Sequence, residues 1–207
     1  MTTQPTGRGQ ITPALLLDIL REAAAVAADV IRDGARRRES IVWREKAATD
    51  FVSEIDTTAE ARILEVLLGR VPGAAILAEE SASTLAAERR ARGVTFVVDP
   101  LDGTTNFLHG VPEYAVSIAA LVDDELVAGV VLQVPRDEWY TATRGGGAWC
   151  NGRRLQVSTI AEPGRALIAT GFPFMHGDDL ERYIGQMRRL MTHTAGLRRP
   201  GSASLDL

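Results

Sequence analysis

The rest of this chain is organised around one run, Val97-Val98-Asp99-Pro100-Leu101-Asp102-Gly103-Thr104-Thr105-Asn106-Phe107. Apolar, mostly β-branched residues from Val94 onward predict a buried strand, which ends at Asp99-Pro100 because proline offers no N–H to a sheet ladder. Asp99 and Asp102 then lie three residues apart on a turn, followed by Gly103 and two threonines. Carboxylate oxygens bind hard cations, and free backbone N–H groups at a helix start bind phosphate. The run therefore predicts a site for a cation and a phosphate at a strand end.

Length and composition describe an ordinary globular protein. The chain has 207 residues, 45% hydrophobic and 24% charged, with a formal net charge of −4, enough for one large domain or two small ones. No basic block stands out beyond Arg36-Arg37-Arg38, so we expect no nucleic-acid partner. One cysteine, Cys150, and no apolar run of membrane-spanning length predict no disulfide, no membrane partner and a cytoplasmic location. Residues 1–10 predict a flexible tail rather than a signal peptide.

Two helices are predicted before the central run. Thr12-Pro13 offers a hydroxyl N-cap and a proline at the first helical position, and apolar residues then recur at steps of three and four. This helix is expected to reach about Arg32, with Gly34 as its stop. Residues 46–56 predict a polar loop that ends at Asp56, which would be the N-cap of the second helix.

Several strands lie around and after the central run, joined by short turns. The expected strands are 75–77, 94–98, 114–121, 126–134 and 138–143. Consecutive strands on short turns predict an antiparallel sheet, and with the two preceding helices this gives an α+β layer. Asn151-Gly152 closes this part with a hairpin-type turn.

The character of the sequence changes after Asn151. Residues 166–170 predict a strand and residues 179–191 a helix with one apolar face, an order that is typical of an α/β layer. We therefore expect an N-terminal α+β domain at 11–150 that carries the metal site, and the start of a C-terminal α/β domain at 151–207.

Asp-Pro and Asp-Gly are common turn dipeptides, and either alone would carry no function. The whole run, however, resembles the signature of the inositol monophosphatase family, Asp-Pro-(Ile/Leu)-Asp-Gly-Thr-x-Asn-(Phe/Tyr). The family consists of magnesium-dependent phosphomonoesterases with a layered αβαβα sandwich. The resemblance extends from about Lys46 to the end of the chain, and it implies two or three Mg²⁺ ions and a homodimer.

The resemblance assigns the metal ligands. Adjacent glutamates such as Glu79-Glu80 are usually a solvated edge, but the family carries Gly-Glu-Glu-Ser here, with Ala78 as the departure. By this resemblance Glu79, Asp99, Asp102 and the carbonyl of Leu101 bind the metal ions, and Glu79 helps to position the attacking water. Such a sparse set of oxygen ligands suits magnesium, and no histidine or cysteine cluster argues for zinc.

The resemblance also implies the catalytic and substrate-binding residues. The hydroxyl of Thr104 would orient the attacking water, with Asp56 accepting the threonine proton. Gly103 and Thr104 would receive the phosphate, and Asp102 would contact a substrate hydroxyl. The family's Gly-(Ser/Thr)-Ala near the substrate corresponds to Gly201, Ser202 and Ala203.

The main departure lies at the C-terminal end. Members of the family continue past the Gly-Ser-Ala motif with a helix and a Trp-Asp-x-Ala-Ala-Gly segment, whose aspartate completes the second metal site. Residues 205–207 predict the first turn of that helix. We therefore expect weak or no activity from these 207 residues alone.

The expected substrate is myo-inositol 1-phosphate or a similar alcohol phosphate. Families that share this fold cut fructose 1,6-bisphosphate, histidinol phosphate or 3′-phosphoadenosine phosphates, and these remain alternatives. Thr105 favours the inositol type, because the nucleotide type tends to carry lysine at this position. A hypothesis of another class is a non-catalytic interaction module, motivated by the missing metal aspartate.

Overall fold

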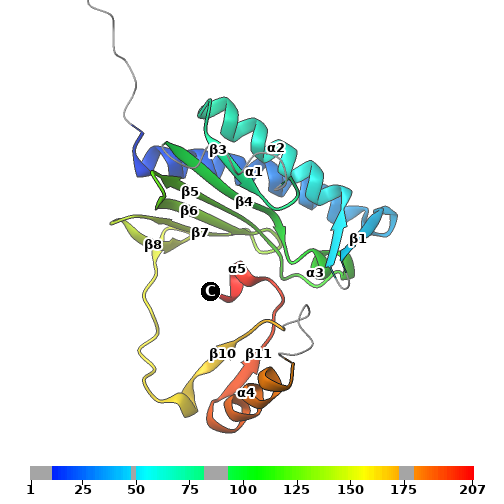
Figure 1. The fold of residues 1–207 in the computed structure, drawn as a ribbon, viewed down its shortest axis with the longest axis vertical. Helices are drawn as coiled ribbons and strands as arrows, with labels where there is room; N and C mark the ends of the chain where they lie inside the picture. Colours follow the sequence, from blue (N-terminus) through cyan, green and yellow to red (C-terminus); the bar gives the residue numbers. More distant parts are fainter. Residues whose placement is uncertain (1–10, 48–49, 82–92, 173–179) are drawn as a thin grey trace, which may run out of the picture.

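A computed structural model describes residues 11–47, 50–81, 93–172 and 180–207, so the tail predicted at 1–10 lies outside the described residues. Two helices, α1 (Pro13–Arg36) and α2 (Glu54–Arg70), cover one face of a seven-stranded sheet (Figure 1). The strands follow one another in the order β3 (Ala75–Ala78), β4 (Val94–Asp102), β5 (Ala115–Val122), β6 (Glu125–Gln133), β7 (Glu138–Thr143), β8 (Gly147–Cys150) and β9 (Arg153–Arg154). The fold is thus a layered α+β arrangement.

The sheet is antiparallel from β4 to β9, as consecutive strands on short turns predict. β3 instead pairs parallel to β4, so the carboxyl ends of these two strands meet at one edge of the sheet. Asp99 pairs with Ser117 and Asp102 with Ala115, which leaves one extra residue on β4. This β-bulge falls at Pro100, which has no N–H to donate.

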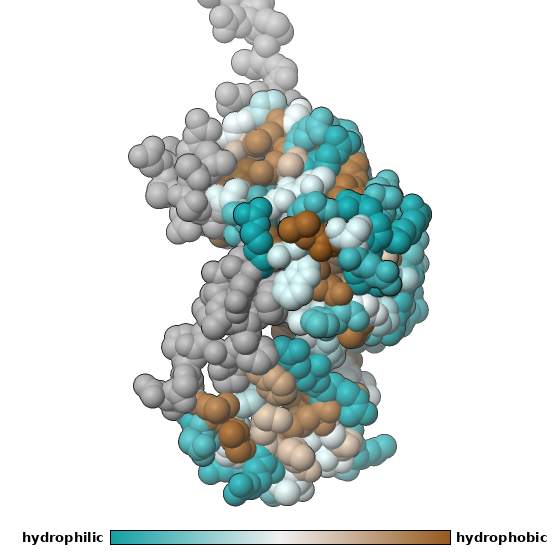
Figure 2. Space-filling model, turned by 90° about the vertical axis from the view of Figure 1, so that its right-hand side faces the viewer, coloured by the Kyte–Doolittle hydropathy of each residue, from teal (hydrophilic) through white to brown (hydrophobic). Residues whose placement is uncertain are grey.

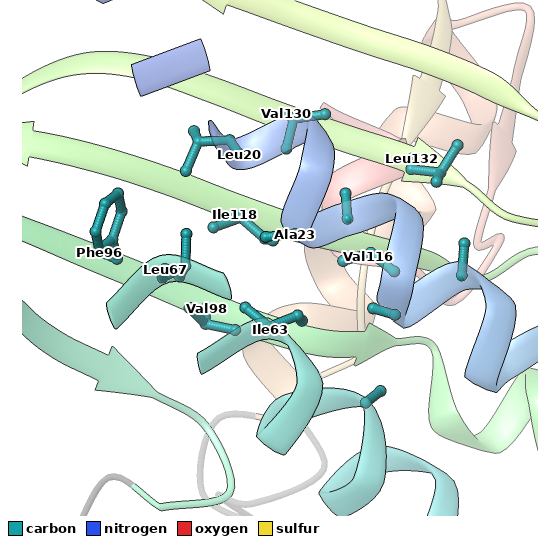
Figure 3. Packing of buried hydrophobic residues seen from close by; sticks show 14 of the residues in the cluster. Leu20, Ala23, Ile63, Leu67, Phe96, Val98, Val116, Ile118, Val130 and Leu132 are labelled. Atoms are coloured by element: carbon teal, nitrogen blue, oxygen red, sulfur yellow. The ribbon is translucent and has the colours of Figure 1, made fainter. Parts of the chain in front are cut away.

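The core lies between the helices and the sheet. Strand residues alternate, so Phe96 and Val98 point into it while their neighbours are only half-buried. Figure 3 shows apolar side chains of both helices packed on those of β4, β5 and β6. The labelled members are Leu20, Ala23, Ile63, Leu67, Phe96, Val98, Val116, Ile118, Val130 and Leu132.

α1 begins as predicted and ends later. The hydroxyl of Thr12 accepts a hydrogen bond from the N–H of Leu15 at 3.2 Å, and Pro13 occupies the first turn. The prediction that Gly34 stops the helix is wrong, because α1 continues to Arg36. A Cβ at Gly34 would lie 2.7 Å from Cδ1 of Ile55, so this glycine allows α1 to approach the start of α2 closely.

The loop predicted at 46–56 is a hairpin followed directly by α2. β1 (Trp43–Ala47) pairs antiparallel with β2 (Asp50–Ser53), and a short 3-10 turn, η1 (Arg38–Ser40), precedes them. Ser53, rather than Asp56, is the N-cap of α2. Asp56 closes a capping box by accepting from the backbone of Ser53, so the predicted N-cap was three residues late.

The C-terminal part contains the predicted strand and helix, and a second strand follows them. β10 (Leu167–Ala169) and β11 (Gly196–Arg198) form a separate parallel pair, linked through α4 (Leu180–His193), and η2 (Pro163–Arg165) precedes them. The chain then returns to the large sheet, where α5 (Ala203–Asp206) lies against β5 and β6 (Figure 1). None of the described helices has the length and apolar character needed to cross a bilayer.

Candidate functional site

A sharp turn joins β4 to α3 (Thr104–His109) at the centre of the site. Gly103 forms this turn with φ of 95°, a left-handed conformation that favours glycine. A Cβ here would also lie 2.9 Å from the carbonyl oxygen of Glu113. Both the positive φ and the lack of space for a Cβ therefore require glycine here. As the sequence predicts, α3 starts immediately after the two aspartates.

Asp56 and Thr104 meet at this turn, although 48 residues separate them. The Thr104 hydroxyl lies 2.8 Å from Oδ1 of Asp56 and 3.0 Å from the carbonyl oxygen of Leu101. Oδ2 of Asp56 accepts from both the N–H and the hydroxyl of Ser53, at 2.8 and 2.6 Å. The structure thus brings the predicted pair together; their catalytic roles stay predictions.

Burial raises the pKa of Asp56 above its usual range, while the hydrogen bonds from Ser53 and Thr104 act in the opposite direction. Asp56 is only 1% exposed, so its carboxyl group has little access to water. An aspartate in this setting can accept the proton of the Thr104 hydroxyl. The threonine oxygen then has lone pairs free to hold a water molecule.

Glu79 and Asp99 lie at the carboxyl ends of the parallel strands β3 and β4. The N–H of Glu79 donates to the carbonyl of Val98 at 3.1 Å, which extends the ladder to the glutamate itself. Burial, the negative charges of Glu79 and Asp102, and a hydrogen bond with Glu79 together raise the pKa of Asp99 to about 8. A cation between these groups would remove the repulsion that raises this pKa.

Asp102 is held by the start of α5. Its Oδ2 accepts from the hydroxyl of Ser202 at 2.7 Å and from the N–H and hydroxyl of Ser204 at 2.7 and 2.5 Å. Its Oδ1 accepts from the N–H of Ala203 at 3.1 Å. A Cβ at Gly103 would lie 3.4 Å from the carbonyl oxygen of Gly201. The predicted substrate-binding residues of both segments therefore gather at one place.

The candidate ligand atoms are oxygens, which suit a magnesium ion, but among the described residues they are not grouped around one point. The described residues contain no group of three or more His, Cys, Asp or Glu side chains placed to hold a metal. Both carboxylate oxygens of Asp102 instead accept hydrogen bonds from residues 202–204. Glu79, Asp99 and the Leu101 carbonyl would supply oxygen ligands, as magnesium prefers. Oδ1 of Asp206 is buried without a described hydrogen-bond partner, and the charge of Asp102 raises the pKa of Asp206 beyond the effect of burial.

Two residues that position the site were given no role by the sequence analysis. Asn106 is 9% exposed, and its Nδ2 donates to the carbonyls of Glu113 at 2.7 Å and Pro200 at 2.8 Å. Buried Glu60 accepts from the N–H of Glu80 at 2.9 Å, which fixes the backbone beside Glu79. Two hints point to Asn106: the signature quoted above includes it, and asparagine disfavours helix interiors, so its place in α3 suggests a separate purpose.

Comparison with known proteins places this geometry in a family. The family model described as "Inositol monophosphatase family" matches residues 13–207. A relative from Pseudomonas aeruginosa named Nus factor SuhB is 44% identical, over 93% of this chain and 71% of the relative. A relative from Rhizobium meliloti named inositol-1-monophosphatase is 43% identical, over 78% of this chain and 60% of the relative.

Solved structures agree with the sequence matches. The extragenic suppressor protein SuhB from Bartonella henselae superposes with a TM-score of 0.86 at 36% identity, covering 92% of this chain and 72% of that one. The inositol monophosphatase from Anabaena (Nostoc) superposes with a TM-score of 0.76 at 31% identity, covering 93% and 69%. On the family model, the relatives and the shared fold, this chain belongs to the inositol monophosphatase family.

Proposed function

We propose that this chain carries the catalytic half-site of a magnesium-dependent phosphomonoesterase, acting on myo-inositol 1-phosphate or similar alcohol phosphates. The observation that carries the proposal is the contact of Thr104 with buried Asp56, beside the strand ends that bear Glu79 and Asp99. The substrate class is supported by the name of the Rhizobium meliloti relative and by the family match.

The chemistry follows from the residue types. Bound magnesium would neutralise the phosphate oxygens and lower the pKa of a coordinated water. Glu79, Asp99 and the Leu101 carbonyl would hold the metal. Thr104 and Glu79 would orient the water for in-line attack, and the water would give a proton to Thr104 as Thr104 passes its own to Asp56. The phosphorus–oxygen bond to the alcohol would break as the new one forms, and the departing oxygen would take a proton from solvent. The N–H groups of Gly103 and Thr104, at the start of α3, would receive the phosphate.

The hydrogen bonds around Asp102 refine the roles predicted for Gly201, Ser202 and Ala203. Ser202 and Ala203 donate to the carboxylate of Asp102. We therefore assign them to orienting Asp102, with Asp102 as the group that meets a substrate hydroxyl or the metal. Gly201 lies against Gly103 and would line the same space. Such outer hydrogen bonds commonly fix the geometry of a carboxylate ligand.

A second candidate function is an interaction role. Several relatives, including the one from Pseudomonas aeruginosa, are named Nus factor SuhB, a name that does not refer to phosphate hydrolysis. The hydrogen bonds from Ser202 and Ser204 to Asp102 also favour an interaction role. With Asp102 so bound, the described residues contain no group of carboxylates placed to hold a metal.

The test measures magnesium binding and phosphate release separately. Magnesium titration by calorimetry and phosphate release from inositol 1-phosphate are followed for the native chain, Asp99→Asn and Asp18→Asn, an exposed aspartate on α1. We expect Asp99→Asn to lose magnesium binding and the weak turnover of the native chain, and Asp18→Asn to retain both. Magnesium binding without turnover on inositol, fructose, histidinol and nucleotide phosphates, by this chain and by one that continues as its longer relatives do, would favour the interaction role. If Asp99→Asn binds magnesium like the native chain, the assigned metal site is wrong.

A further inference from the structure

The three consecutive arginines at the end of α1 do not form a uniform basic surface. Arg36 lies 3.8 Å from the carboxylate of Asp33, and Arg37 lies 2.7 Å from that of Glu54, with both pairs largely exposed. Exposed ion pairs of this kind contribute little to stability. Arg38, the first residue of η1, instead contacts α3. This side of the molecule faces the viewer in Figure 2, where hydrophilic side chains surround small apolar patches.

Arg38 covers a fully buried aromatic ring of α3. Its guanidinium carbon lies 5.4 Å from the centre of the Phe107 ring, within the range of a cation–π contact. Phe107 is 0% exposed, whereas Arg38 is half-buried and lines an open pocket of about 460 Å³ formed by residues 35–40. The guanidinium therefore separates the Phe107 ring from solvent.

The surroundings of the guanidinium fit it closely. Gly110, the C-cap of α3 with φ of 75°, leaves room for it, because a Cβ there would lie 3.3 Å from Nη1 of Arg38. Burial raises the pKa of Tyr114, while the charge of Arg38 and a hydrogen bond with it lower that pKa, so the guanidinium also reaches this phenol. Nε of Arg38 is buried without a hydrogen-bond partner among the described residues. A buried donor without a partner costs free energy, so hydrogen bonding at Nε does not explain why Arg38 lies here.

α3 depends on such contacts because it is short. It has six residues, whereas an isolated helix needs roughly 12–15 to be even marginally stable in water. Phe107 follows Thr104 by three residues, so both lie on neighbouring positions of the helix surface. The N–H of Phe107 donates to the carbonyl of Gly103 at 3.0 Å. A displacement of Phe107 would therefore move the turn that carries Thr104.

We propose that Arg38 is a positioning residue for the candidate site. By holding Phe107 it fixes α3, and with α3 it fixes the Thr104 hydroxyl and the N–H groups of Gly103 and Thr104. The role given to Thr104 rests on the proposed function, whereas the contact between Arg38 and α3 does not. Arg38 touches neither the predicted substrate-binding residues nor the predicted metal ligands in this account, and it acts through Phe107.

The first test compares the removal of two arginines that lie two residues apart. Amide hydrogen exchange is followed by mass spectrometry for the native chain, Arg38→Met and Arg36→Met, since methionine keeps an unbranched stem without the charge. In Arg38→Met, exchange in residues 104–110 should be roughly three- to tenfold faster, as the loss of one cation–π contact would give. Arg36→Met should leave it unchanged, because the Arg36 side chain is 78% exposed. Native exchange in Arg38→Met overturns the proposal. So does an equal acceleration in α1 and α2, since Arg38 would then support the core.

The second test uses the conservative variant Arg38→Lys, which also serves if Arg38→Met does not fold. Lysine keeps the positive charge but has no flat guanidinium to lie over Phe107. The variant also loses the buried Nε that has no partner, so the melting temperature should stay close to the native value. Exchange in residues 104–110 should nevertheless be faster than in the native chain. If Arg38→Lys exchanges like the native chain there, any cation suffices and the guanidinium does not hold α3.

The third test connects the contact to the candidate site. It uses this chain and one that continues as its longer relatives do. Arg38→Met should lower kcat for inositol 1-phosphate by roughly tenfold, because small displacements of a positioned group reduce rates steeply. Magnesium affinity, measured by calorimetry, should stay native, since Glu79 and Asp99 lie at the ends of β3 and β4 rather than on α3.

The remaining outcomes separate this proposal from the proposed function. Faster exchange in α3 with native kcat would overturn the positioning role. A loss of magnesium binding in Arg38→Met would also overturn it, because Arg38 would then act through the strand ends. If the native chains release phosphate from no ester, the proposed function fails. The exchange comparison then decides by itself whether Arg38 holds α3.

Discussion

Every buried apolar side chain that the structure describes lies between Leu16 and Val134, whereas the described residues beyond 150 bury only the side chain of Ser202. The N-terminal part is therefore stabilised by a continuous apolar core between two helices and a sheet. The C-terminal part is attached to it by polar contacts, chiefly those that Asp102 and Asn106 make across the junction. The two parts should respond differently to the same kind of substitution.

The candidate site lies where the two parts meet. Asp56, Glu79, Asp99 and Thr104 belong to the part with the apolar core. The segment from Gly201 to Ala203 belongs to the lightly held part and reaches the site through hydrogen bonds to Asp102. A site divided in this way can keep the predicted metal ligands Glu79 and Asp99 in place while the segment predicted to face the substrate adjusts.

The largest expected difference comes from the same substitution in the two parts. Leu67→Ala removes a side chain with 0% exposure from the core, and should cost roughly 2–5 kcal/mol of the free energy of unfolding. Leu167→Ala, at a site 58% exposed on β10, should cost less than about 1 kcal/mol. Urea denaturation followed by circular dichroism gives both values. Equal losses would show that the C-terminal part has a core of its own.

The next effect concerns pH and the carboxylates of the site. With its pKa raised to about 8, Asp99 keeps its proton in the folded chain at pH values where the unfolded chain has lost it. Stability should therefore fall as the pH rises from about 4 to 8, by roughly 2–4 kcal/mol in metal-free buffer. Asp99→Asn should flatten most of this slope, leaving a share from Asp56, whose pKa is also raised. Added magnesium should reduce the fall near pH 8. An unchanged slope in Asp99→Asn would refute this origin.

A smaller effect is expected at the junction. Asn106→Ala removes both hydrogen bonds of Nδ2 and leaves the carbonyls of Glu113 and Pro200 without that donor, which should cost roughly 1–3 kcal/mol. Hydrogen exchange should accelerate in residues 196–207 and remain slow in α1. Ser158→Ala, an exposed polar site in the C-terminal part, serves as the control. Uniform acceleration over the whole chain would show that Asn106 supports the core rather than the junction.

Sequence reasoning succeeds where local pattern and tertiary structure agree. The period of α1, its Thr12 cap and the antiparallel order from β4 to β9 follow from residue spacing and turn chemistry. The β1–β2 hairpin was missed because its residues are largely polar and show no alternation. The role of Gly34 was misread because a glycine near a helix end resembles a stop. Only the packed structure shows that Ile55 occupies the space beside it.

For the site, the family signature and the strand ends are enough to predict the meeting of Asp56 with Thr104 and of Glu79 with Asp99. The engagement of Asp102 by Ser204 could not be predicted, since 102 residues separate them and neither pattern refers to the other. Whether an aspartate faces a metal or a helix start depends on how a distant segment packs. A local sequence motif contains no information about that packing.

The smallest expected effect compares glycine-to-alanine substitutions in a helix of each part. Alanine favours a helix interior over glycine by roughly 0.5–1 kcal/mol. Gly185 in α4 has open space where a Cβ would lie, so Gly185→Ala should gain about that amount, seen as slower hydrogen exchange in α4. At Gly34 the new Cβ would lie 2.7 Å from Ile55 and 3.2 Å from Phe107, so Ile55 must move. Gly34→Ala should therefore lose about 1 kcal/mol net in urea denaturation. If Gly34→Ala instead raises the free energy of unfolding, the packing around Gly34 in the N-terminal part adjusts to a new side chain as easily as the surface of α4 does.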